Sequence, residues 1–265
     1  MLKYTEFVDE LKNYFSKDDF EVKITNDLME ISRKSNKQKF LLNITQTYYQ
    51  YLNSKEEFHQ IINSIDKIYE DKIDFLNYKS IKDRLFIKVG PKNTTLPYTE
   101  VEGLAITYHI LISKEYGCNS IQVREDMLDR YGVDIKIIHE IALKNTQKLF
   151  PLKIMKMVRF LKETTIGSLT YEELDEMIVL TNDIKINGAS ALFYPGIMEK
   201  IHSRIGNYYI LPSSIHELIL VPDIFPDLAL KNIVLSVNRD IVDVYDFLSD
   251  NIFYYDKENG FRKVD

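Results

Sequence analysis

The sequence contains few of the residues on which secreted and membrane scaffolds depend. It has only one cysteine, Cys118, so an intramolecular disulfide is impossible. It also has no tryptophan. No stretch approaches the roughly 20 apolar residues of a transmembrane helix, so we expect no membrane span. The first residues, Met1–Glu6, lead into a charged amphipathic segment rather than the apolar part of a signal peptide. A lone thiol without an export signal predicts a cytoplasmic location.

The motifs that identify frequent enzyme classes are also missing from the sequence. Nine glycines leave little material for a phosphate-binding loop, and neither GxGxxG nor GxxxxGK followed by Ser or Thr occurs. The five histidines form neither an HExxH motif nor a cluster with cysteine, so no metal and no cofactor is expected. The sequence leaves catalysis open, but it favours a protein that is not an enzyme.

The overall charge bears on the choice of partner. The chain of 265 residues is 45% hydrophobic, which is enough to bury a core. Its formal net charge is −6 and its pI is near 5.5. A general nucleic-acid binder carries a basic surface that attracts phosphate. The acidic balance therefore disfavours nucleic acid, although a local basic patch would still permit it.

The pattern of apolar residues predicts an α+β fold from the first third of the chain. A helix is expected over Thr5–Phe15, where apolar residues recur on one face. Three strands follow it at Phe20–Thr25, Leu28–Arg33 and Lys39–Ile44. Ser54 and Glu57 form a capping box ahead of a helix predicted over Lys55–Asp71. Helix, meander and helix in this order are typical of an antiparallel sheet covered by helices.

The rest of the chain mixes strands and helices without a regular βαβ period, which favours antiparallel or mixed sheets with helices packed on them. Leu104–Ile112 is apolar on both faces and is predicted to be a central strand. Other strands are expected at Leu85–Val89, Ser120–Arg124, Met177–Thr181, Ala189–Tyr194, Tyr208–Leu211, Ile215–Val221, Ile252–Tyr255 and Phe261–Val264. Helices are expected after Asp134, after Pro151, after Pro195-Gly196 and over Asp227–Val237. The unpatterned stretch 162–170 suggests two lobes, 1–163 and 171–265, with a single domain as the alternative.

One segment places a serine, a histidine and a carboxylate together. Ser214, His216 and Glu217 are the candidate catalytic residues of a hydrolase-like enzyme. If Ile215–Val221 is a strand, Ser214 and His216 point the same way without meeting, and Glu217 points to the other face. Known triads gather their members from separate segments, and no GxSxG motif occurs. A turn followed by a half-buried strand is therefore the favoured interpretation.

A basic ridge is the second candidate site. A helix after Pro151 would place four cationic side chains on one side, namely Lys153, Lys156, Arg159 and Lys162. Such a ridge would bind phosphate, nucleic acid or an acidic partner. The alternative is an ordinary solvated face whose lysine stems cover apolar surface.

Clustered tyrosines are the third feature of interest. They occur in Tyr48–Tyr51, Phe193-Tyr194, Tyr208-Tyr209 and Phe253–Tyr255. Tyrosine is enriched at protein interfaces because its ring is apolar and its hydroxyl still forms hydrogen bonds. These clusters favour a protein partner.

Several short blocks of the sequence are similar to one protein family. The most specific is Tyr209–Glu217, which reads Tyr-Ile-Leu-Pro-Ser-Ser-Ile-His-Glu and precedes Pro222-Asp223. Weaker blocks are Tyr4–Phe7, Lys82–Leu85, Leu180–Asn182, Gly188-Ala189, Tyr194–Gly196 and Tyr254–Asp256. Together they resemble an uncharacterised bacterial family of domains of unknown function, DUF family 5688. The resemblance implies a bacterial cytoplasmic protein linked to mobile elements, and it implies no activity, cofactor or catalytic residue.

Three hypotheses of function follow from the sequence. The first is a non-catalytic cytoplasmic protein that binds or regulates through a protein partner and does not associate with a membrane. The second is a hydrolase-like enzyme around His216. The third is a nucleic-acid or nucleotide binder that uses the basic ridge.

Overall fold

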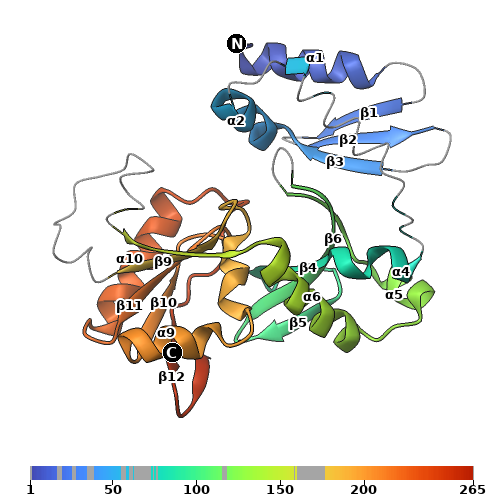
Figure 1. Ribbon diagram of the computed structural model, residues 1–265. Helices are drawn as coiled ribbons and strands as arrows, with labels where there is room; N and C mark the ends of the chain where they lie inside the picture. The colour runs from blue at the N-terminus through green and yellow to red at the C-terminus, as the bar shows by residue number, and fades with distance from the viewer. Residues whose placement is uncertain are drawn as a thin grey trace. The chain divides into compact units, whose positions relative to one another are not determined.

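The structure is a computed structural model with an α+β fold, as the sequence predicts (Figure 1). It describes residues 2–16, 20–25, 28–34, 39–54, 58–59, 62, 73, 75, 77–114, 118–157, 159 and 177–264. Within these ranges, no helix combines the length and the apolar character that crossing a membrane requires. The chain divides into two compact units, Met1–Asp74 with Leu111–Ile121 and Phe75–Ile110 with Gln122–Asp265. The stretch 162–170, where the sequence suggests a boundary, lies outside the described residues.

A three-stranded antiparallel sheet and two helices form the N-terminal part of the first unit. Its elements are α1 (Tyr4–Phe15), β1 (Phe20–Thr25), β2 (Leu28–Arg33), β3 (Lys39–Asn43) and α2 (Ile44–Ser54). The predicted first helix and meander are confirmed almost residue for residue. Phe7 is buried, and its ring lies 5.2 Å from the rings of Tyr48 and Tyr51 on α2. These two tyrosines of the first cluster therefore contribute to packing.

The position of α2 corrects the sequence prediction. This helix was not predicted, and it runs up to Ser54, the serine of the predicted capping box, whose partner Glu57 lies outside the described residues. Ile44, Thr47 and Tyr51 are buried at the i, i+3, i+7 spacing of a helix. The segment was missed because its β-branched and aromatic residues also suit strands. Most of the helix predicted over Lys55–Asp71 lies outside the described residues.

The second sheet is built around a central buried strand. Its path is β4-β6-β5, and β7 also pairs with β6. The strands are β4 (Leu85–Pro91), β5 (Tyr98–Val101), β6 (Leu104–Ser113) and β7 (Asn119–Gln122). The helices that accompany them are α4 (Tyr78–Ile81), η1 (Lys82–Arg84), α5 (Glu125–Tyr131) and α6 (Ile135–Leu149). The predictions of a central β6 and of the cap at Asp134, whose carboxylate accepts Lys136 N–H at 2.7 Å, are confirmed.

Thr146 on α6 supplies a hydrogen bond to the free edge of β4. Its buried hydroxyl accepts the backbone N–H of Ile87 at 2.9 Å and donates to the Ala142 carbonyl. We expect Thr146→Val to lower the free energy of unfolding by about 1–3 kcal/mol, because the buried Ile87 N–H loses its acceptor while the side-chain volume is kept. Urea unfolding measures this change, and Thr146→Ser, which keeps the hydroxyl, is the control. Equal stabilities of the Val and Ser variants would contradict the assignment.

His109 on β6 is a buried histidine with one bonded nitrogen. Its Nε2 lies 3.0 Å from Thr107 Oγ1, whereas its Nδ1 has no hydrogen-bond partner among the residues described. Burial, assisted by the positive charge of Lys88, holds the pKa of His109 well below its usual value. The folded state therefore keeps this imidazole neutral in acid, while the unfolded chain protonates it.

This difference in protonation predicts an acid-sensitive fold. Below a pH of about 6.5 the unfolded chain binds a proton that the folded state excludes, so stability falls by up to about 1.4 kcal/mol per pH unit at this residue. We expect His109→Phe, which packs beside Phe86, to reduce that slope and to cost little near neutral pH. Urea midpoints measured at several pH values check both effects. If the stability of the variant depends on pH as steeply as that of the wild type, the prediction is contradicted.

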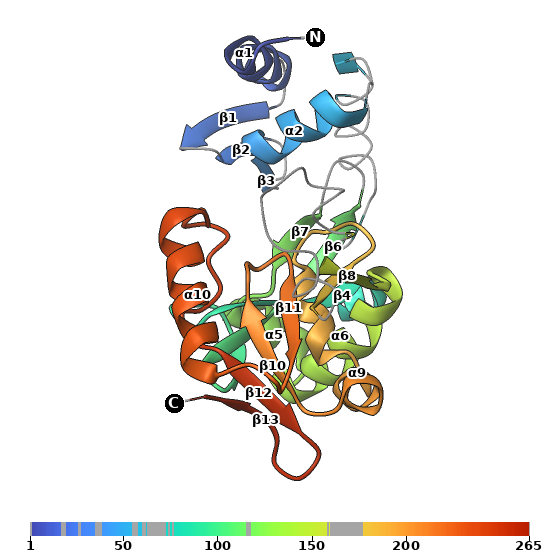
Figure 2. The ribbon, with the colours of Figure 1, turned by 90° about the vertical axis from the view of Figure 1, so that its left-hand side faces the viewer.

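The third sheet has six strands, all antiparallel to their neighbours, in the order β13-β12-β10-β11-β9-β8. They are β8 (Leu152–Lys156), β9 (Ile178–Asn182), β10 (Tyr208–Pro212), β11 (Leu218–Pro222), β12 (Phe253–Asp256) and β13 (Gly260–Lys263). Described helices of this region include η2 (Gly188–Phe193), α9 (Ile197–Ile205) and α10 (Asp227–Asp240). Figure 2 shows α10 beside this sheet, and its Leu230 and Val234 are buried in a cluster with Leu211, Val221 and Ile252.

Three local predictions in this region are wrong. The helix predicted after Pro151 is strand β8, and the strand predicted at Ala189–Tyr194 is the 3₁₀ helix η2. The strand predicted at Ile215–Val221 begins only at Leu218, so Ser214, His216 and Glu217 belong to a loop. Short apolar runs cannot be assigned from periodicity alone, because helices and strands both contain them. The strands at β9 and β10, the helices α9 and α10 and the final hairpin are confirmed.

Candidate functional site

The loop 213–217 joins the paired ends of β10 and β11 and contains the three catalytic candidates. The Ser214 hydroxyl donates to Glu217 Oε1 at 2.8 Å and accepts the backbone N–H of His216 at 2.9 Å. Ser214 is buried. Its hydroxyl therefore holds the loop in shape by bonding two of its own residues.

The imidazole of His216 connects this loop to two others. Its Nδ1 accepts the backbone N–H of Asn187 at 3.1 Å, and its Nε2 lies 3.0 Å from Asp246 Oδ1. Because Nδ1 accepts a hydrogen bond, the neutral ring carries its hydrogen on Nε2 and donates it to Asp246. A triad histidine instead needs a lone pair directed at the nucleophile. Both ring nitrogens are bonded and Ser214 contacts the backbone of His216, so this geometry links loops and directs no ring lone pair at the serine.

Backbone groups of the same loop make further connections. Thr181 Oγ1 donates to the His216 carbonyl at 2.7 Å, and the Ala189 N–H donates to the Ile215 carbonyl at 3.1 Å. The Ile215 N–H in turn donates to the Asp246 carbonyl at 2.8 Å. The loop therefore ties together β9, the start of η2 and the residues after α10. We call this set the His216 junction, and its side-chain or backbone contributors are Thr181, Asn187, Ser214, His216 and Asp246.

The residues between α10 and Asp246 present apolar side chains to solvent. Ile241, Val244 and Tyr245 are 72%, 79% and 69% exposed, and we call these three residues the apolar turn. Asp243 shapes the turn, since its carboxylate accepts the Tyr245 N–H at 2.9 Å and its carbonyl accepts the Asp246 N–H at 2.9 Å. Asp246 is held by the His216 junction. The junction therefore fixes the end of a turn whose own apolar residues contribute little to the core.

The comparison with protein families gives one match. A family model described as a family of unknown function (DUF5688) covers residues 5–257. The chain belongs to this family. No curated protein and no solved structure matches the chain.

In this DUF5688 protein, several sequence blocks that carry the resemblance meet at the His216 junction. Thr181 comes from one block, Gly188-Ala189 from a second and Ser214 with His216 from a third. A Cβ atom added at Gly188 would overlap Thr181 Oγ1 and the His216 carbonyl oxygen. The blocks are far apart in sequence, and the fold brings them into direct contact. Asn187 and Asp246 complete the junction, and sequence analysis missed both.

In the DUF5688 protein, the first two residues of the predicted basic ridge lie on a strand and not on the expected helix. Lys153 and Lys156 lie on strand β8, three positions apart, so their side chains leave opposite faces of the sheet. Arg159 is exposed, and Lys162 lies outside the described residues. The run Leu-Lys-Ile-Met-Lys forms a strand through its pairing with β9. Anion binding by these residues stays a prediction, but Lys153 and Lys156 lie on a strand and not on one side of a helix.

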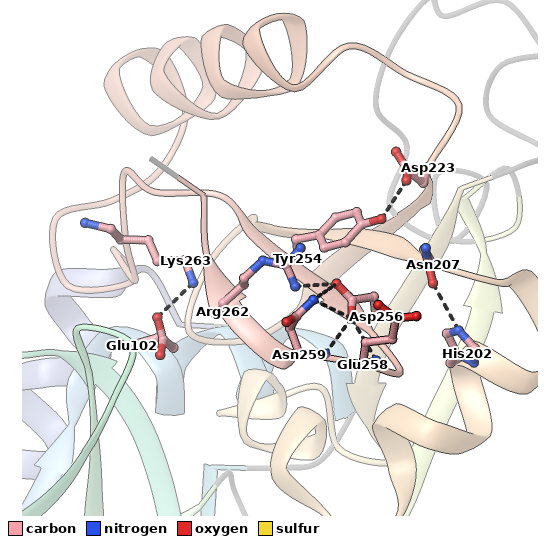
Figure 3. A network of polar contacts seen from close by, with 10 residues as sticks. All are labelled: Glu102, His202, Asn207, Asp223, Tyr254, Asp256, Glu258, Asn259, Arg262 and Lys263. Atoms are coloured by element: carbon pink, nitrogen blue, oxygen red, sulfur yellow. Dashed lines mark hydrogen bonds and ion pairs between the residues drawn. The ribbon is translucent and has the colours of Figure 1, made fainter.

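The tyrosine clusters near the C-terminus mostly support the fold. Tyr208 is buried and stacks on Tyr255, with 5.4 Å between ring centroids. The buried Tyr194 donates its hydroxyl to the Phe150 carbonyl at 2.7 Å. Tyr254 donates to Asp223 at 2.6 Å (Figure 3), and burial together with this bond raises its pKa to about 12. These side chains are therefore structural, whereas the exposed Tyr245 was not singled out by its sequence.

A second polar network closes the final hairpin, as Figure 3 shows around Asp256. The Asp256 carboxylate accepts the backbone N–H groups of Glu258 and Asn259 at 2.9 and 2.7 Å, and it pairs with Arg262. The bonds from Asn259 and Arg262 lower the pKa of Asp256 to about 2. The Arg262 guanidinium also lies 4.6 Å from the centre of the Tyr254 ring. This network uses its charges internally and stabilises the β12–β13 turn.

Proposed function

We propose that this protein is a non-catalytic binding or regulatory protein of the bacterial cytoplasm and that a protein partner docks on its apolar turn. The observation that carries the proposal is the exposure of Ile241, Val244 and Tyr245 within one five-residue stretch. Single exposed apolar residues are common, but a group of large ones is typical of interaction sites. Apolar surface that is removed from water contributes about 25 cal/mol per Å², so covering these side chains favours docking there.

The attachment of the turn supports the same function. Binding elements that are already ordered lose less conformational entropy when a partner docks. Two hydrogen bonds hold the end of the turn, from His216 Nε2 to the Asp246 carboxylate and from the Ile215 N–H to the Asp246 carbonyl. The His216 junction would thus act as a positioning element for the apolar turn. The hydrolase-like alternative gains less support, since the His216 ring has no lone pair directed at Ser214.

A comparative pull-down tests the proposal. Tagged protein is recovered from the native host in three forms, namely wild type, Val244→Ser with Tyr245→Ser, and Ile137→Ser as the control. Ile137 is also an exposed apolar residue, but it lies on α6. We expect at least one protein to co-purify with the wild type and the control and to be lost with the double variant. Recovery of the same proteins with all three forms would exclude the apolar turn as the docking site.

A further inference from the structure

The charge of the segment around the apolar turn indicates the chemistry of its partner. Residues 223–250 contain six aspartates and only two cationic residues, so this short segment has a net charge of −4, out of −6 for the whole chain. The helix α10 itself is neutral, with two aspartates and two cations, so the imbalance lies in the residues that flank it. Acidic residues near an apolar surface select partners through charge complementarity.

Three exposed aspartates lie close to the apolar turn, and we call them the acidic rim. Asp240 directly precedes Ile241, and Asp243 directly precedes Val244. Asp250 lies beside the last turn of α10, because its carboxylate accepts Asn238 Nδ2 at 2.9 Å. Arg239, the neighbouring cation, is paired with Asp240 at 2.8 Å. One guanidinium against three carboxylates leaves the surroundings of the apolar turn negative.

The exposed side of α10 extends the apolar surface away from the turn. Leu228 and Leu235 are exposed and seven residues apart, so they project from the same side of the helix. Asp223 and Asp227, both exposed, lie at the other end of α10. A helix of 14 residues is about 21 Å long, which is the length of a short partner helix. Apolar residues with aspartates at both ends therefore suit an elongated ligand.

We infer that the partner contributes an amphipathic segment whose apolar residues are flanked by lysine or arginine. This inference rests on the proposed docking at the apolar turn and adds the partner's chemical class. The apolar residues of the segment would cover Val244 and Tyr245, and its cations would face the acidic rim. A second copy of this chain fits less well, because a symmetric contact would bring two acidic rims together.

Designed peptides test the inference with the intact protein. The binding of three fluorescent helical peptides is compared by anisotropy. The first consists of leucine and lysine, with the leucines on one face of the helix. In the second, glutamate replaces each lysine, and in the third, serine replaces each leucine. We expect only the leucine–lysine peptide to bind, and its affinity should fall as salt is raised, since exposed charges are screened. The double variant Val244→Ser with Tyr245→Ser should weaken binding by about tenfold or more.

Charge-neutralising variants separate the acidic rim from general acidity. Asp240→Asn with Asp243→Asn should weaken binding by about three- to tenfold, the effect expected for two exposed ion pairs. The matched control is Glu125→Gln with Asp129→Asn on α5, which should leave affinity unchanged. Circular dichroism and melting of each variant exclude misfolding as the cause.

The outcomes distinguish this inference from the proposed function. Equal binding of the leucine–glutamate peptide, or affinity that ignores the acidic-rim variant, would overturn the inference. So would self-association in sedimentation that the Val244–Tyr245 variant abolishes, because the apolar turn would then serve a second copy. If no peptide binds but the pull-down still loses a protein with the turn variant, the proposed function stands and only the partner's class is wrong.

Discussion

Gly188→Ala is expected to lower the free energy of unfolding by about 3 kcal/mol or more, because its Cβ has no space in the His216 junction. The added atom would overlap Thr181 Oγ1 and the His216 carbonyl oxygen, and it would lie 3.0 Å from the Asn182 nitrogen. The first two atoms are hydrogen-bonded to each other at 2.7 Å, and the third belongs to strand β9. Relief of the overlap therefore requires the loop to separate from the sheet.

Glycines elsewhere in the chain provide the comparison. A Cβ added at Gly90 meets nothing within 4 Å, and that residue has no left-handed conformation. Gly90→Ala should therefore melt close to the wild-type temperature, while Gly188→Ala should melt far below it or fail to accumulate as soluble protein. Thermal melting followed by circular dichroism measures the difference. Similar melting temperatures for the two variants would show that the loop relaxes at low cost.

His216→Ala is expected to destabilise the fold by about 2–3 kcal/mol, which is roughly 4 to 10 °C in melting temperature. The substitution removes the acceptor of the Asn187 N–H and the donor to the Asp246 carboxylate. Bonds to a charged group are worth more than neutral ones, so the second loss adds substantially to the first. Ser214→Ala should cost about 1 kcal/mol, as the loss of hydrogen bonds within a single loop.

Partner binding supplies a second measurement for His216. Because Asp246 ends the apolar turn, His216→Ala should also weaken binding of any ligand that docks on Val244 and Tyr245. Ser214→Ala leaves the His216–Asp246 bond in place and should bind almost normally. An unchanged melting temperature for His216→Ala would overturn the structural role of the junction.

Local structure was predictable from the sequence where turn residues and periodicity agreed. The strands Phe20–Thr25 and Leu28–Arg33 are separated by Asn26-Asp27, and both were placed correctly. The run Leu152–Lys156 was placed in a helix because a run this short does not distinguish the two periods. Only its pairing with β9 decides its structure, and that partner begins more than 20 residues later.

The candidate site was predictable in part. The block around His216 was recognised as significant, and Ser214 and Glu217 do contact each other. The partners of the imidazole were not predictable, since Asn187 and Asp246 are 29 and 30 residues away and reach it only through the folding of the sheet. The apolar turn was missed for a different reason. Exposure is a property of tertiary packing, and apolar residues in a sequence are normally assigned to the core.

The pairing of β8 with β9 also has a consequence for the length of the chain that joins them. The ladder is extended by a bond of 2.9 Å from the Met157 N–H to the Met177 carbonyl, so the chain returns to the point where it left the sheet. Each doubling of the length between two fixed ends costs only about 0.6 kcal/mol of closure entropy. The register of β8 on β9 is set by the strands themselves and does not depend on that length. Lengthening the chain between these two methionines therefore costs the pairing of β8 with β9 little closure entropy.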